Sequence, residues 1–259
     1  MKQGLADLKP TERFTGLADL YTRYRPDYPA EAIDFILAHC HLWPGSLVVD
    51  VGSGTGTSSR QLAQRGITVI GIEPNEEMRQ QAASLSVPEG MPAPTYRDGR
   101  GEETGLPDAC TDAVLSAQAF HWLDAERALA EFRRILKPDG WVVLMWNERD
   151  EMDPFTAAYG DVLRSTPEGA RLEARRTRAG EALLQSPLYQ HRERVVFRHR
   201  QELDEDGVIG RARSASYAPR ETQAVQVFCD ALRQAFARHQ CDGKVALHYE
   251  TAVFVGQRR

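Results

Sequence analysis

The sequence predicts a doubly wound α/β fold, in which helices cover both faces of a mostly parallel sheet. From residue 47 onward, short apolar runs rich in β-branched residues alternate with helical patterns. The runs are apolar throughout, as is typical of strands that a parallel sheet buries on both faces. A glycine-rich turn follows the first run directly. This alternation indicates βαβ units, which place helices on the two faces of one sheet.

Six segments are predicted strands. Four short ones lie in the first part of the chain, at residues 47–51, 67–73, 113–117 and 141–146. Two more follow at residues 192–200 and 244–255. In the last segment, every second residue from Val245 to Val255 is aliphatic, Tyr or Thr. That alternation predicts a long antiparallel strand at a sheet edge or in a hairpin.

Six further segments are predicted helices. They lie at residues 29–39, 57–64, 76–85, 125–136, 153–164 and 221–239. The segment at 125–136 carries the clearest boundary signals, because Asp124 stands at its N-cap position and Pro138 and Gly140 follow its end. Leu129 and Phe132 share its apolar face. We therefore expect this helix to pack on the sheet through that face.

Length and composition fit one large domain or one core with a small appendage. Of 259 residues, 42% are hydrophobic and 27% charged, which allows a sizeable core and excludes extensive disorder. The net charge of −5 argues against binding nucleic acid through bulk electrostatics. No apolar run approaches the ~20 residues of a membrane span, and the N-terminus lacks the apolar stretch of a secretory signal. We expect small-molecule partners, no nucleic acid and no membrane.

Cysteine and histidine usage predicts no metal site. The four cysteines have no paired-ligand spacing, and no histidine pairs with Cys, Asp or Glu at a recognised metal-ligand spacing. We expect free thiols in a reducing cytoplasm. The sequence predicts no particular oligomeric state.

The predicted elements divide the chain into four parts. Residues 1–44 are expected to form N-terminal cap helices, and residues 45–149 the cofactor-binding core. Residues 150–240 are expected to supply cap or lid segments, with one core strand near 192–200. Residues 241–259 are expected to supply the last core strand.

The strongest local signal is a strand that runs into a glycine-rich turn before a helix. Asp50 ends the strand, Gly52, Gly54 and Gly56 form the turn, and Glu73 ends the next strand 21 positions after Gly52. Such a turn brings the backbone close to a ligand at a helix N-terminus, and the acid can accept both hydroxyls of a ribose. These features alone permit a nicotinamide dinucleotide or an adenosyl compound. Thr57 occupies the position of the third dinucleotide glycine, which favours the adenosyl ligand.

Four motifs in order resemble those of class I S-adenosylmethionine-dependent methyltransferases. They are residues 50–56 (DVGSGTG), 73–75 (EPN), 105–108 (GLPD) and 136–140 (LKPDG). Three more, at 24–29 (YRPDYP), 118–122 (QAFHW) and 213–217 (RSASY), resemble the small-molecule branch that includes trans-aconitate and cantharidin-type methyltransferases. The resemblance implies a Rossmann-like, seven-stranded sheet with one antiparallel strand and a helical cap over the active site. It also implies S-adenosylmethionine as cofactor and S-adenosylhomocysteine as product.

Carried over position by position, the resemblance implies a cofactor site at the carboxyl ends of the strands. Gly52, Ser53 and Gly54 would face the amino acid end of the cofactor, and Glu73 would bind its ribose. Arg100 departs from the small or acidic residue expected beside adenine, so no side-chain contact is carried over there. Tyr24 is either a contact to the cofactor carboxylate or a packing residue. The full expected set is Tyr24, Asp50, Gly52, Ser53, Gly54, Glu73, Pro74, Gly101, Glu102, Ser116 and Ala117.

The acceptor is expected just past the predicted strand at residues 113–117. His121 is the candidate general base, since its intrinsic pKa suits proton transfer near neutral pH, and packing against Trp122 is its alternative role. Expected acceptor contacts are Trp122, Asn147, Arg213 and Tyr217. Trp122 is alternatively a core residue, and Arg213 is alternatively part of a solvated helix.

The sequence therefore predicts a methyltransferase acting on a small molecule. Carboxyl O-methylation is one hypothesis, with Arg213 positioning the acceptor carboxylate. Hydroxyl or carbon methylation, with His121 as base, is the other. Two further alternatives stay open: a module that binds the adenosyl ligand without transferring methyl groups, and an NAD(P)-dependent oxidoreductase.

Overall fold

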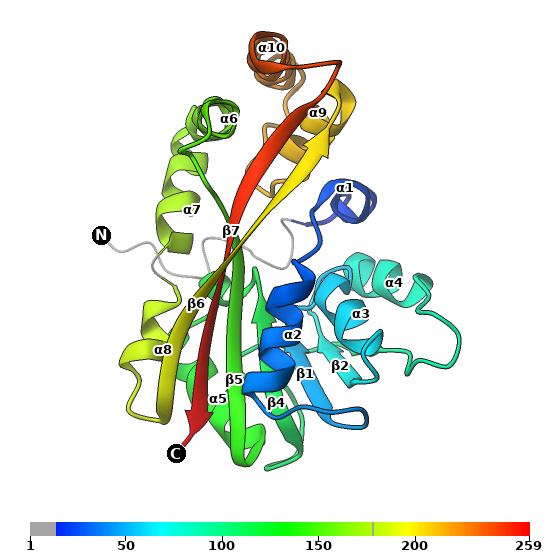
Figure 1. The fold of residues 1–259 in the computed structure, drawn as a ribbon, viewed down its shortest axis with the longest axis vertical. Coiled ribbons are helices and arrows are strands. Elements are labelled where there is room, and N and C mark those ends of the chain that lie inside the picture. Colours follow the sequence, from blue (N-terminus) through cyan, green and yellow to red (C-terminus); the bar gives the residue numbers. More distant parts are fainter. Residues whose placement is uncertain (1–13, 178) are drawn as a thin grey trace.

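A seven-stranded sheet forms the centre of the molecule (Figure 1). The computed structural model describes residues 14–177 and 179–259. The strands are β1 (Leu47–Val51), β2 (Thr68–Ile72), β3 (Thr95–Arg97), β4 (Thr111–Ala117), β5 (Leu136–Arg149), β6 (Tyr189–Leu203) and β7 (Val245–Arg258). Their order across the sheet is β3-β2-β1-β4-β5-β7-β6. β1 to β5 pair in parallel, and β7 is antiparallel to both β5 and β6. The predicted doubly wound sheet with one antiparallel strand is confirmed.

Helices cover both faces of the sheet and one of its ends. They are α1 (Ala18–Tyr24), α2 (Ala30–His39), α3 (Thr57–Ala63), α4 (Glu76–Ser84), α5 (Ala125–Ile135), α6 (Pro154–Arg164), α7 (Pro167–Thr177), α8 (Glu181–Gln185), α9 (Glu205–Arg213) and α10 (Thr222–His239). Apolar residues of α2 and α3 pack on one face, and those of α5 and α8 pack on the other. Successive residues of β1, β4 and β5 point alternately into these two cores, which explains why the strands are apolar throughout.

The position of β7 corrects the expectation of an edge strand or hairpin. β7 lies between β5 and β6, and α9 and α10 separate it from β6 along the chain. Buried and half-buried residues alternate only from 245 to 250, whereas every residue from 251 to 256 is buried. The second half of β7 therefore lies within the sheet with both faces covered. The first half extends into the cap with one face covered, and this half produced the alternating pattern.

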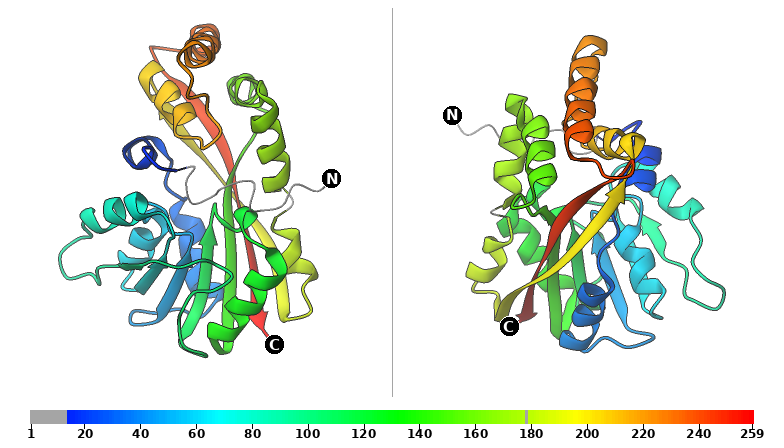
Figure 2. Two further views of the ribbon diagram at one scale, coloured as in Figure 1. Left: turned by 180° about the vertical axis from the view of Figure 1, so that it is seen from behind. Right: turned by 45° about the horizontal axis from the view of Figure 1, so that its top comes forward.

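A third core joins the cap to the sheet. Apolar residues of α6, α9 and α10 pack together and against the first half of β7. In Figure 2 these helices stand beyond one end of the sheet, where the extended β6 and β7 carry α9 and α10. The parallel strands point their carboxyl ends toward this cap. No helix in the described part of the chain is long and apolar enough to cross a membrane.

Leu232 tests the packing of the cap. Its side chain is fully buried in the third core. Leu232→Ala should lower the free energy of unfolding by ~2–5 kcal/mol, because it removes buried methyl groups and leaves a cavity. Val227 on the same helix is 67% exposed, so Val227→Ala should change that free energy by less than ~0.5 kcal/mol. Urea denaturation of both variants measures the difference, and equal losses would show that this cap core is not tightly packed.

Candidate active site

The glycine turn after β1 has a backbone shape that suits close contact with a ligand. Gly52, Gly54 and Gly56 all have left-handed φ angles, of 71°, 53° and 75°. A Cβ atom on Gly52 would lie 2.3 Å from the Cβ of Ala119, so this position has no room for a side chain. A Cβ atom on Gly54 would meet nothing within 4 Å. The backbone at Gly54 therefore borders open space.

Two buried carboxylates hold the turn in place. Asp50 Oδ2 accepts hydrogen bonds of 2.7 Å from the hydroxyls of Ser58 and Ser59, which ties β1 to the first turn of α3. Glu73 accepts from the backbone N–H groups of Gly54, at 3.0 Å, and Asn75, at 2.9 Å. Burial raises the pKa of both carboxyl groups above the usual range, and these hydrogen bonds oppose the rise. Together, the two acids fix the turn relative to both neighbouring strands.

The Glu73 carboxylate can accept further hydrogen bonds, for example from the hydroxyls of a ribose. A carboxylate has about four lone-pair directions, and its two backbone bonds occupy only part of them. Asp50 Oδ1 and Ser53 Oγ are likewise buried without a hydrogen-bond partner among the described residues. Buried polar atoms of this kind favour a polar ligand at the turn. The residues at the ends of β1 and β2 thus fit an adenosyl cofactor.

The loop after β3 forms the next part of the site. Gly101 is packed so closely that a Cβ atom would lie 2.4 Å from Leu123 Cδ1. Glu102 accepts a 2.8 Å hydrogen bond from the backbone N–H of Asp124, at the start of α5. Its carboxylate therefore positions α5. Pro74 is half-buried between Glu73 and α4.

One cleft brings residues from five parts of the chain together. It is lined by Tyr21, Arg25, Pro26, Tyr28, Gly52, Ser53, Gly54, Thr57, Ser58, Ala117, Gln118, Asn147 and Arg211. Five of the expected site residues lie here: Gly52, Ser53, Gly54, Ala117 and Asn147. Ser116 is buried beside them and donates a 3.0 Å hydrogen bond to Val51 O. The predicted convergence of the glycine turn with the ends of β4 and β5 is therefore present.

Eight residues of this cleft lie outside the expected set: Tyr21, Arg25, Pro26, Tyr28, Thr57, Ser58, Gln118 and Arg211. Tyr21 lies one helical turn before Tyr24, and the Arg25 guanidinium lies 4.7 Å from the centre of the Tyr21 ring. Tyr24 itself packs on α9, because a Cβ atom on Gly210 would lie 2.4 Å from its ring. The rotation of α1 about its axis therefore turns Tyr21 toward the cleft and Tyr24 toward α9.

Gln118 has an unusual backbone conformation at the end of β4. Its φ of 58° is uncommon for a residue with a side chain. Its N–H donates a 2.8 Å hydrogen bond to Met145 O on β5, which holds this turn. Strained residues of this kind gather at functional sites. A cue in the sequence was its place directly after a predicted strand.

Asn147 is held in place from three sides. Its Oδ1 accepts a 2.6 Å hydrogen bond from the Thr251 hydroxyl and lies 3.2 Å from His199 Nε2. Its Nδ2 donates to Asp27 O at 3.3 Å, in the connection between α1 and α2. Asn147 therefore joins β5, β6, β7 and the N-terminal segment at the wall of the cleft.

His121 lies on the short 3₁₀ helix η2 (Phe120–Trp122), outside the lining of the cleft as the described residues define it. The indole N–H of Trp146 donates to His121 Nδ1 at 3.3 Å, and the Trp122 ring centre lies 4.8 Å from the His121 ring centre. Because Nδ1 is an acceptor, neutral His121 carries its proton on Nε2. In that tautomer Nε2 is a hydrogen-bond donor.

The other two expected acceptor contacts have different surroundings. Arg213 is exposed, whereas Arg211 on the same helix is 4% exposed and lines the cleft. Two residues turn a helix by about 200°, so the two arginines point to opposite sides. Tyr217 donates a 2.5 Å hydrogen bond to Glu173 on α7.

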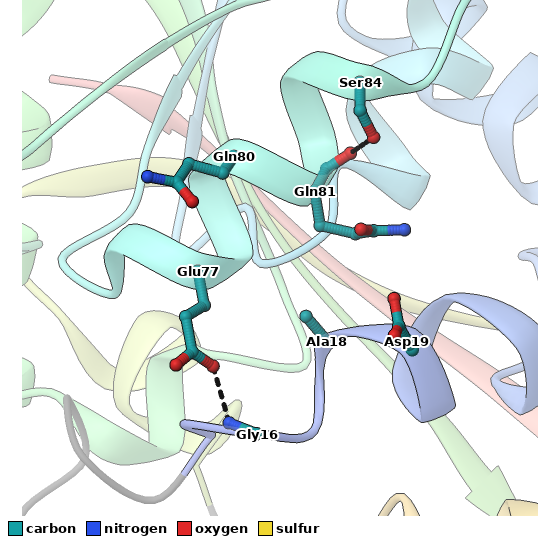
Figure 3. Close-up of a pocket in the computed structure, with 7 residues that line it drawn as sticks. All are labelled: Gly16, Ala18, Asp19, Glu77, Gln80, Gln81 and Ser84. Atoms are coloured by element: carbon teal, nitrogen blue, oxygen red, sulfur yellow. Dashed lines mark hydrogen bonds between the residues drawn. The ribbon is translucent and has the colours of Figure 1, made fainter.

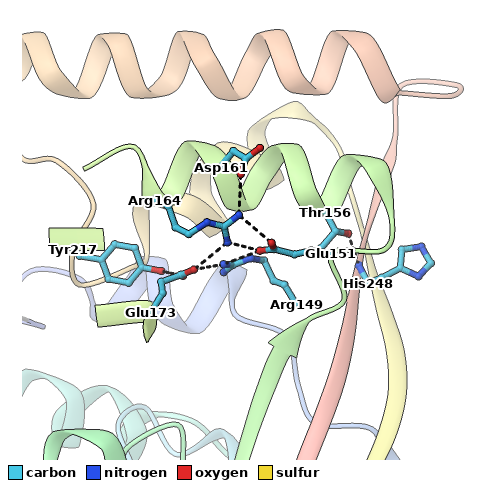
Figure 4. Close-up of polar contacts among 8 residues, drawn as sticks. All are labelled: Arg149, Glu151, Thr156, Asp161, Arg164, Glu173, Tyr217 and His248. Carbon is cyan, nitrogen blue, oxygen red and sulfur yellow. Dashed lines mark hydrogen bonds and ion pairs between the residues drawn. The ribbon is translucent and has the colours of Figure 1, made fainter. Parts of the chain in front are cut away.

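A charged cluster joins the end of β5 to α6 and α7 (Figure 4). Arg149 pairs with Glu173 and Glu151, and Arg164 pairs with Glu151 at 2.5 Å. Burial works against the charge of Arg149, but Glu173 outweighs it, so the pKa of Arg149 lies above its ordinary value. The cluster fixes the position of α7 and, through Glu173, that of Tyr217.

A second depression lies between the start of α1 and the outer side of α4 (Figure 3). Glu77 crosses one end of it and accepts a 2.5 Å hydrogen bond from the backbone N–H of Gly16. Asp19, Gln80, Gln81 and Ser84 also line it. None of the expected site residues lies there. Among the described residues, no group of three or more His, Cys, Asp or Glu side chains could hold a metal ion.

Comparison with known proteins identifies the core. Residues 49–144 match the family model described as a methyltransferase domain. The core of this chain is therefore similar to a methyltransferase domain. Its cofactor is S-adenosylmethionine, which agrees with the polar groups around the glycine turn.

Relatives extend the likeness beyond the core. An uncharacterized methyltransferase of Mycobacterium tuberculosis is 37% identical over 150 residues, which are 58% of each chain. An uncharacterized methyltransferase of Schizosaccharomyces pombe is 30% identical over 156 residues, 60% of each chain. The matched region spans about three fifths of the length of these relatives.

Solved structures share the whole fold. A putative type II methyltransferase from Anaeromyxobacter dehalogenans has a TM-score of 0.63 and 25% identity, covering 90% of this chain and 98% of that one. A Haemonchus contortus phosphoethanolamine N-methyltransferase, solved with S-adenosylhomocysteine, has a TM-score of 0.57 and 14% identity. It covers 98% of this chain and 59% of that one, and the likeness concerns the fold.

Glu73 offers a direct test of the methyltransferase domain's cofactor site. Glu73→Ala should weaken S-adenosylhomocysteine binding by ~1–3 kcal/mol, because hydrogen bonds to a charged group are lost. Glu76→Ala is the matched control, since Glu76 is exposed on the first turn of α4. Calorimetric titration measures both affinities. Equal affinities in the two variants would remove Glu73 from the cofactor site.

Proposed function

We propose that this protein transfers the methyl group of S-adenosylmethionine to a small-molecule acceptor bound under the cap, releasing S-adenosylhomocysteine. The observation that carries this proposal is the shared cleft. The glycine turn, the end of β4 and the cap residue Arg211 line a single opening. A methyl donor at the turn and an acceptor under the cap would therefore meet inside it.

Methyl transfer requires alignment and exclusion of water more than it requires covalent help from the protein. When bound, S-adenosylmethionine supplies a methyl group on a sulfonium centre. The turn at Gly54 and the carboxylate of Glu73 would hold the donor. Tyr21, Arg25 and Tyr28 border the cleft from the N-terminal segment, and α9 borders it through Arg211. These elements would keep water away from the reacting atoms.

We further infer that the acceptor is a small carboxylic acid methylated on oxygen. The motifs that resemble the trans-aconitate and cantharidin-type branch support this class. A carboxylate is ionised at neutral pH and attacks without a general base. The donor state of His121 Nε2 agrees with a reaction that needs no base. A buried arginine in the cleft offers a cation to position the carboxylate.

The release of S-adenosylhomocysteine from matched acceptors tests this proposal. A panel should pair carboxylic acids with the corresponding alcohols, phenols and amines on the same carbon skeletons. Product release with carboxylic acids is the expected result. Release only with alcohols, phenols or amines would contradict carboxyl methylation. Binding of S-adenosylhomocysteine without turnover of any acceptor would favour a non-methylating module.

Substitution of His121 separates the two chemistries. Asn retains an acceptor oxygen for the Trp146 indole, so His121→Asn should keep the local packing. For carboxyl methylation we expect kcat to fall less than ~10-fold, because no proton is removed. Loss of a general base costs ~10²–10⁴-fold instead. A fall of that size in the steady-state rate would identify His121 as the base and contradict carboxyl methylation.

A further inference from the structure

Two arginines near the cap have buried side chains, and they differ in whether a carboxylate pairs with them. Arg149 has carboxylate partners in Glu173 and Glu151. Arg211 on α9 is 4% exposed, and no ion pair joins it to a carboxylate within residues 14–177 and 179–259. Its Nε atom is buried without a hydrogen-bond partner. A buried charge without an opposite charge is costly, and proteins keep such groups mainly where a ligand completes them.

The surroundings of Arg211 are tyrosines. Tyr159 on α6 and Tyr249 on β7 lie close enough to influence its charge, and the Tyr159 hydroxyl is also buried without a partner. Burial works against the charge of Arg211, but Tyr249 and Tyr159 outweigh it, so its pKa lies above the ordinary value and it stays protonated. Among the described residues, the Nε–H of Arg211 and the hydroxyl of Tyr159 are thus buried donors without an acceptor. A carboxylate is the group that such donors bind best.

We propose that Arg211 is the subsite that binds the anionic group of the methyl acceptor. The inference rests on the proposed function and assigns its specificity to one side chain. Arg211 lines the cleft together with Gly54 and Asn147, so an anion held there lies within the same opening as the cofactor turn. Arg213, which the sequence suggested for this role, is exposed.

The cofactor has a carboxylate of its own, and the placement of the neighbours favours the acceptor. Tyr159 and Tyr249 belong to α6 and β7 and pack in the cap core with Ala212 of α9. None of these three residues lines the cleft, so the side chains around Arg211 belong to the cap core. Arg25, by contrast, reaches the cleft from the N-terminal segment and donates 3.1 Å hydrogen bonds to Ser214 Oγ and O. The Arg211 subsite therefore lies on the cap side.

Thermal unfolding with saturating S-adenosylhomocysteine tests the subsite with simple carboxylates. The probes are acetate, benzoate, succinate and tricarballylate, each beside its neutral amide. We expect at least one carboxylate to raise the Tm more than its amide does. That difference should vanish in Arg211→Met and persist in Arg238→Met, a control on the exposed side of α10. Absence of any carboxylate-specific shift in the unsubstituted protein would overturn the proposal.

The Tm of Arg211→Met without carboxylates separates a binding role from a structural one. Removal of an uncompensated buried charge should leave the Tm unchanged or raise it, whereas loss of a structural arginine lowers it. Arg211→Lys keeps the charge and should retain part of the carboxylate response. A structural role predicts a lowered Tm in Arg211→Met. It also predicts that Arg211→Lys keeps the full carboxylate response, as Arg213→Met does. These two results together would assign Arg211 to the scaffold.

Calorimetric titration shows whether Arg211 binds the carboxylate of the acceptor or that of the cofactor. S-adenosylhomocysteine should bind Arg211→Met within ~3-fold of its affinity for the unsubstituted protein. The affinity for 5′-methylthioadenosine, which lacks the carboxylate, serves as the comparison. If Arg211→Met weakens S-adenosylhomocysteine binding by ~10-fold or more but leaves 5′-methylthioadenosine binding unchanged, Arg211 holds the cofactor. That result overturns the subsite and leaves methyl transfer intact. Failure of the unsubstituted protein to bind S-adenosylhomocysteine at all would instead refute the proposed function.

Discussion

The hydrogen bond from Gly54 N–H to the Glu73 carboxylate is the contact on which the site depends. It joins the turn after β1 to the end of β2, and the bonds of Asp50 to Ser58 and Ser59 join the same turn to α3. Both carboxylates are buried, so their desolvation is offset only while these donors stay in place. The left-handed glycines can then keep a shape that side chains would not allow. The turn is consequently shaped before any ligand binds.

The cap depends on a different principle, the extension of two strands beyond the sheet. β6 and β7 carry α9 and α10 past the carboxyl ends of β1 and β4, and the third apolar core fixes them there. Arg149 and its acids attach α7 to the same end of β5. The cap thereby brings Arg211 into the same cleft as the glycine turn. Cofactor and acceptor sites come from separate parts of the chain that meet in one cleft.

The sequence predicted best what is local in the chain. The strand, turn and helix from Asp50 to Thr57 are contiguous, so their pattern identified both fold and cofactor. β3 has only three residues and escaped detection, and β7 appeared as an edge strand because only its first half alternates. The sequence pointed to Arg213 rather than Arg211 because residue type does not reveal which side of a helix faces inward. The indole of Trp146, which donates to His121, comes from β5, and this contact had no signal in the sequence.

Calorimetric titration with S-adenosylhomocysteine and, separately, with NAD tests the central claim most directly, namely that the turn held by Asp50 and Glu73 is an adenosylmethionine site. The account predicts saturable binding of S-adenosylhomocysteine at one site per chain and no heat of binding with NAD. Saturation by NAD with no response to S-adenosylhomocysteine would contradict it, and would reassign the cleft to the chemistry of a dehydrogenase.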